Sequence, residues 1–170
     1  MNEVFRVLIA TQDLHTRLML EGLLKAVRAR FVHADTEESI HSYLKTPEGF
    51  DMVVVDGAWE FLSIHGIHLA CRSRSKTLSE THLMVILPSG NSTQVIGAFN
   101  DGADTVLRQP IRPLEFLNAC RTGQHLTRLT RSNRALSEPL PAPAPASALP
   151  EPASAPMRFS AAGELIGLHV

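Results

Sequence analysis

The stretch FDMVVVD, residues 50–56, decides the fold. An unbroken apolar run extends from Met52 to Val55 and is rich in valine. β-Branched residues favour strands, and a continuous apolar run is typical of a strand buried on both faces of a parallel sheet. Asp56 follows at the carboxyl end of this strand, where open α/β sheets place their functional groups. The stretch therefore predicts a central strand that ends in an acidic side chain.

Strand and helix signals alternate on both sides of this stretch. Four further apolar stretches predict strands, at residues 5–10, 31–34, 83–87 and 104–108. Apolar residues with helical spacing predict five helices, at about residues 14–30, 35–46, 60–74, 93–100 and 114–137. Alternation of this kind indicates an α/β fold with a parallel sheet covered on both faces. We expect a flavodoxin-like, doubly wound sheet of five strands in the order 2-1-3-4-5 with five helices.

The composition changes abruptly after Ser137. Of the 11 prolines in the 170-residue chain, seven lie in residues 139–156, a segment that has almost no large apolar side chains. Such a composition is typical of an extended spacer. The sequence thus predicts a domain at residues 1–137, a Pro/Ala-rich linker at 138–156 and a short apolar tail at 157–170. Two roles stay open for this tail: a docking peptide, or the start of an output domain.

Charge and cysteine content exclude several classes of protein. The net charge is −1, which gives no bulk attraction to nucleic acid or to anionic membranes. Cys71 and Cys120 are far apart and form no CxxC pair, so a disulfide framework or a cysteine zinc site is not expected. The chain has neither a signal peptide pattern nor an apolar run of membrane-spanning length. We expect a cytoplasmic protein that binds neither nucleic acid nor membranes.

Three blocks of sequence resemble the receiver domain of bacterial response regulators. They are residues 7–10, residues 50–56 and the stretch GADTVLRQP at residues 102–110, and the intervals between them also fit that family. The resemblance covers about residues 4–136. It implies a CheY-like fold and a role in two-component signalling, with Asp56 at the position of the phospho-acceptor.

In this chain, other residues replace the side chains that assist phosphoryl transfer and switching in that family. The resemblance places the family's acid pair on Thr11 and Gln12, beside Asp13, its hydroxyl residue on Leu87 or Ser89, its lysine on Gln109 and its switch aromatic on Val106. Mg²⁺ requires hard oxygen ligands that normally include carboxylates, and phosphoryl transfer needs positive charge to offset the charge that develops. We therefore expect a degenerate pseudo-receiver without catalytic residues, metal or cofactor. In it Asp56 is a vestigial acid that hydrogen-bonds neighbouring backbone.

Two alternatives remain open for the site around Asp56. The first is an atypical phospho-accepting receiver that uses Asp13 and Asp56, in which case Mg²⁺ would be its cofactor. The second is a domain that binds a small ligand, a nucleotide or a cofactor, at the ends of the strands.

The last predicted helix carries a possible partner face. Leu126, Leu129, Asn133 and Leu136 fit an a/d/a/d pattern, and asparagine at an a position favours a defined two-stranded register. The resemblance implies contacts through the last two helices and the fifth strand. We expect a homodimer or a docked protein partner there, regulating a tethered or separate output domain. The same helix carries Arg121, Arg128, Arg131 and Arg134, which we expect to form a solvated basic face.

Overall fold

A computed structural model describes residues 4–60, 62–73, 81–88 and 91–137 of the chain. Its strands are β1 (Arg6–Ala10), β2 (Arg30–Ala34), β3 (Met52–Asp56), β4 (His82–Leu87) and β5 (Thr105–Arg108). Its helices are α1 (Leu14–Ala26), α2 (Glu37–Leu44), α3 (Ile64–Ser73), α4 (Ser92–Asn100) and α5 (Pro113–Ser137). The strands form one parallel sheet in the order β2-β1-β3-β4-β5, which confirms the predicted topology.

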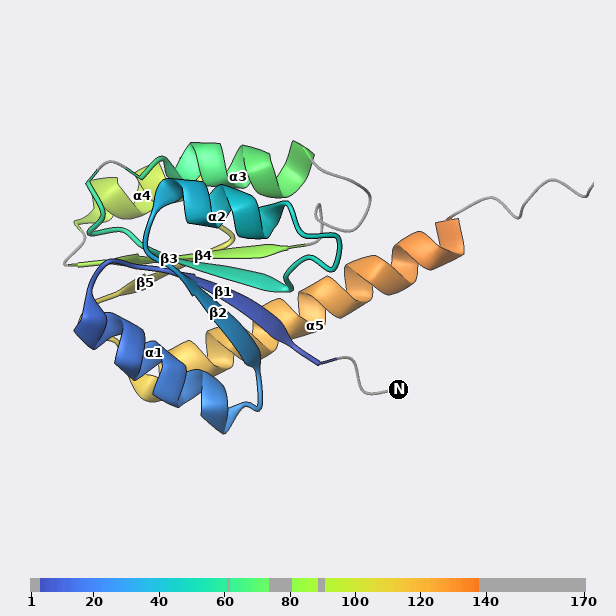
Figure 1. Cartoon of the computed structure of the whole chain (residues 1–170), viewed down its shortest axis with the longest axis horizontal. Coiled ribbons are helices and arrows are strands. Elements are labelled where there is room, and N and C mark those ends of the chain that lie inside the picture. The colour runs from blue at the N-terminus through green and yellow to red at the C-terminus, as the bar shows by residue number, and fades with distance from the viewer. Residues whose placement is uncertain (1–3, 61, 74–80, 89–90, 138–170) are drawn as a thin grey trace, which may run out of the picture. The chain divides into compact units, whose positions relative to one another are not determined.

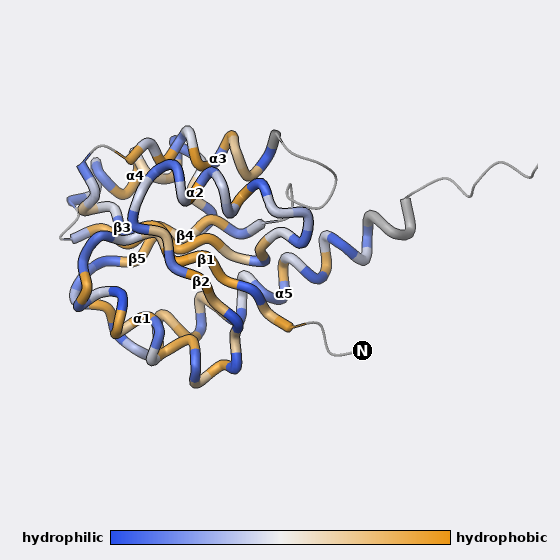
Figure 2. Tube along the Cα trace, in the orientation of Figure 1, coloured by the Kyte–Doolittle hydropathy of each residue, from blue (hydrophilic) through white to orange (hydrophobic). Residues whose placement is uncertain are grey.

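The helices cover both faces of the sheet. Helices α1 and α5 lie on one face, and α2, α3 and α4 lie on the other (Figure 1). All five residues of β3 are buried, as predicted for the central strand. Val53 and Val55 pack toward one face, whereas Met52 and Val54 pack toward the other. Figure 2 shows apolar residues concentrated along the strands. None of the helices in the described part combines the length and apolar character that crossing a bilayer requires.

Two helix boundaries differ from the predicted ones by four residues, whereas the others agree within about two. Helix α1 ends at Ala26 because Arg28 adopts a left-handed conformation, with φ of 55°. The backbone N–H of Ala29 then donates to the carbonyl of Leu24 at 3.1 Å, which caps the helix and turns the chain into β2. The apolar pattern runs on past this point, so it gave no sign of the turn.

Helix α3 begins at Ile64, four residues later than predicted. The side chain of Ser63 accepts a hydrogen bond from the backbone N–H of Gly66 at 2.9 Å, so Ser63 supplies the N-terminal cap. The predicted linker and tail, residues 138–170, lie outside the described residues, and their boundaries stay predictions.

Helix α5 comes unusually close to the sheet at Gly123. A Cβ atom at this position would lie 2.5 Å from Cε of Met52 and 2.9 Å from Cδ2 of His82. These two residues begin β3 and β4. The absence of a side chain at Gly123 therefore allows the helix backbone to pack directly on the amino edge of the sheet.

We predict that Gly123→Ala lowers the free energy of unfolding by about 1–3 kcal/mol, because the added methyl overpacks this contact. Alanine would otherwise favour a helix by roughly 1 kcal/mol over glycine. Urea unfolding measures the change. Gly97→Ala in α4 is the matched control, because nothing lies within 4 Å of a Cβ there, and we expect it to be neutral or stabilising. Equal stability of the two variants would contradict the close approach.

Candidate functional site

Asp56 ends β3, and its residue is only 4% exposed. The hydroxyl of Thr11 donates a hydrogen bond to Oδ2 of Asp56 at 2.7 Å. The backbone N–H of Ala58 donates to Oδ1 at 3.0 Å. The expected hydrogen bond to neighbouring backbone is therefore present, and the contact with Thr11 is an addition that sequence reasoning missed. Both carboxylate oxygens have a neutral donor from the protein itself.

Hydrogen bonds fix both the backbone and the side chain of Thr11. It follows β1 directly, and its residue is 1% exposed. Its carbonyl accepts a hydrogen bond from Nε2 of His33 at 2.8 Å, and its own N–H donates to Ala34 at 3.2 Å. Its side-chain oxygen accepts from the N–H of Asp13 at 3.1 Å. Because that oxygen accepts from one side, the hydroxyl proton is free to point at Asp56.

Asp13 and Gln12 have local backbone partners. The carboxylate of Asp13 accepts a hydrogen bond from the N–H of Thr16 at 2.7 Å and so caps the start of α1. Hydrogen bonds from Thr16 hold the pKa of Asp13 below its ordinary value. The side-chain amide of Gln12 donates to the carbonyl of Asp35 at 3.3 Å.

A pocket of about 350 Å³ opens beside Asp56. Its lining consists of Asp13, His15, Thr16, Met19, Asp56, Ala58, Gln109, Pro110 and Ile111. Gln109 precedes Pro110 through a cis peptide bond. This lining thus includes three of the predicted positions, Asp13, Asp56 and Gln109, and Thr11 joins them through its hydrogen bond to Asp56. This lining contains neither lysine nor arginine, so no permanent cation faces the buried carboxylate within it.

The remaining predicted switch positions lie outside this pocket lining. Leu87 is buried, and its Cδ2 would be 2.8 Å from a Cβ at Gly57, so it packs against the turn that follows Asp56. Val106 is half-buried and packs against the core beneath α2, α3 and α4. Ser89 lies outside the described residues.

The residues around Asp56 do not fit a magnesium ion. Mg²⁺ prefers an octahedral shell of oxygen ligands that usually includes carboxylates. Here the hydroxyl of Thr11 points its proton at Asp56, and Asp13 is engaged in capping α1. Among the described residues, no three His, Cys, Asp or Glu side chains are grouped closely enough to hold a metal.

The predicted partner residues lie on an exposed side of α5, where Leu126 borders a surface pocket next to the start of β4. Leu126 is 48% exposed, Leu129 is 46% exposed and Asn133 is exposed. We call these three residues the outward stripe. Thr127, which follows Leu126, is buried and faces the start of β3. The side chain of Leu136 lies outside the described residues.

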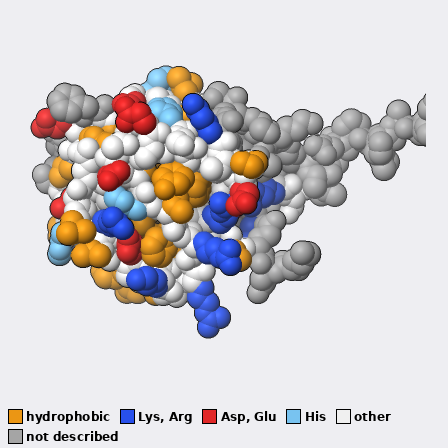
Figure 3. Space-filling view, in the orientation of Figure 1, with side chains coloured by type: hydrophobic (Ala, Val, Ile, Leu, Met, Phe, Trp, Pro, Cys, Tyr) orange, Lys and Arg blue, Asp and Glu red, His pale blue; other side chains and the backbone are white. Residues whose placement is uncertain are grey.

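The expected basic face of α5 is not uniformly solvated. Nη1 of Arg131 lies 2.7 Å from Oδ1 of Asp51, so this arginine forms an ion pair with the sheet. Arg121 and Arg128 are exposed as expected, and the side chain of Arg134 lies outside the described residues. Figure 3 shows that the visible face of the molecule mixes apolar, basic and acidic side chains.

Solved structures with a similar fold include several response regulators and receiver domains. A response regulator from Thermotoga maritima has a TM-score of 0.62 and 17% identity, covering 72% of this chain and 98% of that one. A CheY-like receiver domain protein from Methanospirillum hungatei JF-1 has a TM-score of 0.64 and 15% identity, covering 75% and 98%. The receiver domain of a sensor histidine kinase from Pseudomonas aeruginosa PAO1, with magnesium coordinated in its active-site cleft, has a TM-score of 0.61 and 11% identity, covering 72% and 98%.

No family model and no curated protein matches the chain. At these identities the likeness to solved structures concerns the fold. The resemblance to CheY-like receivers is thereby confirmed at that level: the chain has the fold of a response-regulator receiver domain.

We predict that Thr11→Val lowers the free energy of unfolding by roughly 1–3 kcal/mol, because a buried carboxylate oxygen loses its donor while the shape of the side chain is kept. Chemical denaturation measures the loss. Thr11→Ser keeps the hydroxyl and is the matched control, with a smaller expected cost. If valine and serine were equally tolerated, the hydrogen bond to Asp56 would not stabilise the fold.

Proposed function

We propose that this chain is a non-catalytic pseudo-receiver, a bacterial cytoplasmic signalling module that acts through protein contacts. The observation that carries this proposal is the hydrogen bond from Thr11 to the buried carboxylate of Asp56. A receiver that accepts a phosphoryl group must bring two anions together at this carboxylate, and it needs cations to do so. In this chain the carboxylate is instead satisfied by a hydroxyl and a backbone N–H.

The charge of the pocket supports the same conclusion. The P. aeruginosa receiver holds magnesium in its cleft, whereas the donor set around Asp56 does not suit that ion. Gln109 supplies a neutral amide where the resemblance implies a lysine. Loss of one preorganised donor costs about 3–4 kcal/mol of transition-state stabilisation in well-studied enzymes. With both the metal ligands and the lysine replaced, an acyl phosphate at Asp56 would have little to stabilise it.

The pocket itself favours a second candidate, a small-ligand domain. Its volume of about 350 Å³ is at the lower end of the range for ligand sites, and polar groups of Asp13, Asp56 and Gln109 converge on it. This candidate requires saturable binding of a small molecule that is lost when Asp56 is replaced. The phospho-accepting alternative requires the binding of Mg²⁺ and a phosphoryl mimic at the same place.

The partner surface that we propose is the outward stripe of α5, together with α4 and β5. In a helical projection Arg121 and Arg128 lie about 140–160° from Leu126 and about 80–100° from Leu129, so these charges flank one side of the stripe. Exposed apolar side chains also lie on α4, where Ile96 is 59% exposed. We propose that two copies pair through this surface and thereby control a tethered or separate output domain.

We predict no Mg²⁺-dependent response of Asp56 to beryllofluoride. Amide NMR of the full chain, titrated with millimolar Mg²⁺ and beryllofluoride, should show no saturable shifts around Asp56 and β5. The variant Thr11→Asp/Gln12→Asp/Gln109→Lys restores the missing acids and lysine and is the positive control. Saturable shifts in the unaltered chain would refute the pseudo-receiver and support the phospho-accepting alternative.

We predict that Leu126→Glu/Leu129→Glu weakens self-association by more than about a hundredfold, because two apolar side chains would no longer be buried in the interface. Analytical ultracentrifugation over a range of concentrations measures the dissociation constant. Leu18→Glu is the matched control, since Leu18 is a 58% exposed leucine of α1 outside the proposed surface. A chain that stays monomeric at every concentration would rule out the homodimer.

A further inference from the structure

Asp51 connects three elements at the amino edge of the sheet. It directly precedes β3, and its residue is 8% exposed. Its Oδ2 accepts a hydrogen bond from the backbone N–H of Arg6 at 2.6 Å, and its Oδ1 pairs with Arg131 at 2.7 Å. Its carbonyl accepts from the hydroxyl of Thr127 at 3.2 Å and from the N–H of His82 at 2.9 Å. One residue thus joins β1, β4 and α5 to the start of β3.

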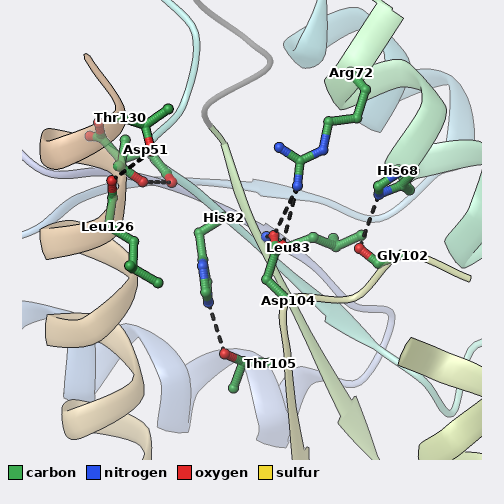
Figure 4. Close-up of polar contacts among 11 residues, drawn as sticks. Asp51, His68, Arg72, His82, Leu83, Gly102, Asp104, Thr105, Leu126 and Thr130 are labelled. Atoms are coloured by element: carbon green, nitrogen blue, oxygen red, sulfur yellow. Dashed lines mark hydrogen bonds and ion pairs between the residues drawn. The ribbon is translucent and has the colours of Figure 1, made fainter. Parts of the chain in front are cut away.

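The contacts on α5 follow the helical repeat. Gly123, Thr127 and Arg131 are spaced four residues apart and therefore lie on one side of the helix. Gly123 packs on the sheet, and the next two members of this series both reach Asp51. Figure 4 shows Asp51 beside α5, with His82 on the neighbouring strand directed at Thr105.

The length of α5 gives this attachment its importance. A helix of 25 residues is about 37 Å long, whereas a strand of five residues spans only about 17 Å. The carboxyl-terminal part of α5 therefore extends beyond the strands that it covers, as Figure 1 shows. Helix ends with few packing contacts open easily, so the attachment to Asp51 decides how rigidly this part is held.

The ion pair has the properties of a firm attachment. The side chain of Asp51 is 11% exposed and that of Arg131 is 31% exposed, so solvent screens the pair only in part. Hydrogen bonds between charged groups are roughly twice as strong as neutral ones. Removal of Arg131 would leave a nearly buried carboxylate without this partner, which is a further cost.

We propose that Asp51 is a positioning residue that clamps the carboxyl-terminal turns of α5 to the amino edge of the sheet. The clamp fixes the direction in which the outward stripe faces its partner. This role rests on the proposed function of the stripe, but the clamp itself is a property of the single chain. It lies at the opposite end of β3 from Asp56, so the orientation of α5 is set away from the pocket.

Hydrogen exchange of the full-length Arg131→Gln variant tests the clamp. We expect amides in residues 127–137 to exchange at least about fivefold faster than in the unaltered protein, while β1 and β3 keep their protection. Arg121→Gln is the matched control, because it removes the same charge from an exposed position of the same helix. Arg131→Lys can still pair with Asp51 and should restore part of the protection.

Two results would overturn the clamp. The first is exchange in residues 127–137 of Arg131→Gln that equals that of Arg121→Gln. The second is faster exchange throughout the sheet, which would make the ion pair a general stabiliser of the fold. Exchange is measured at dilute concentration on the single chain, so its result is independent of self-association. If the chain never dimerised, the proposed function of the stripe would be wrong. The exchange experiment would still decide whether Asp51 holds α5 in place.

Discussion

The burial of β3 on both faces is the constraint on which the rest of the structure depends. When helices cover both faces of a parallel strand, the middle of that strand can carry only apolar side chains. Polar side chains are then confined to its two ends, where Asp51 and Asp56 lie. Each carboxylate is nearly buried, and each is satisfied by donors from neighbouring elements. The two ends of one strand thus have separate polar networks.

The network at the carboxyl end consists of neutral donors. Thr11 stands where the resemblance implies an acid. A carboxylate at that position would repel Asp56, whereas the hydroxyl of Thr11 donates a hydrogen bond to it. With threonine in place of an acid, the site carries less negative charge, so it has less need of a metal ion to balance that charge. The lysine that would otherwise balance a phosphoryl group is also replaced, by Gln109. These replacements are consistent with one another, and together they support the proposed pseudo-receiver.

Much of the fold could be predicted from the sequence because it depends on local patterns. The apolar run before Asp56 and the alternation of strands and helices indicate the layers, and 2-1-3-4-5 is a common strand order for such a doubly wound sheet. The approach of Asp13 and Gln109 to Asp56 also follows, since the carboxyl ends of parallel strands meet at one edge. The end of α1 could not be predicted, because Arg28 adopts a left-handed conformation that the surrounding sequence does not require.

The contact between Asp51 and Arg131 could not be predicted either. The two residues are far apart in the sequence, and their approach depends on how closely α5 packs on the sheet. Gly123 was the available signal, since a glycine inside a helix often has a packing reason. Its missing side chain brings α5 within reach of Asp51, and the helical repeat then presents Thr127 and Arg131 to the same residue.

The separate polar contacts at the two ends of β3 affect how such a domain could signal. In a phospho-accepting receiver, chemistry at the carboxyl end must be transmitted through the sheet to a partner surface. Here the proposed partner surface lies on α5, and this helix is attached at the amino end. A partner that binds the outward stripe would meet a helix whose direction is already fixed by Asp51, so little ordering is needed on binding. Under the proposed function, contact at this surface would carry the signal without a covalent change at Asp56.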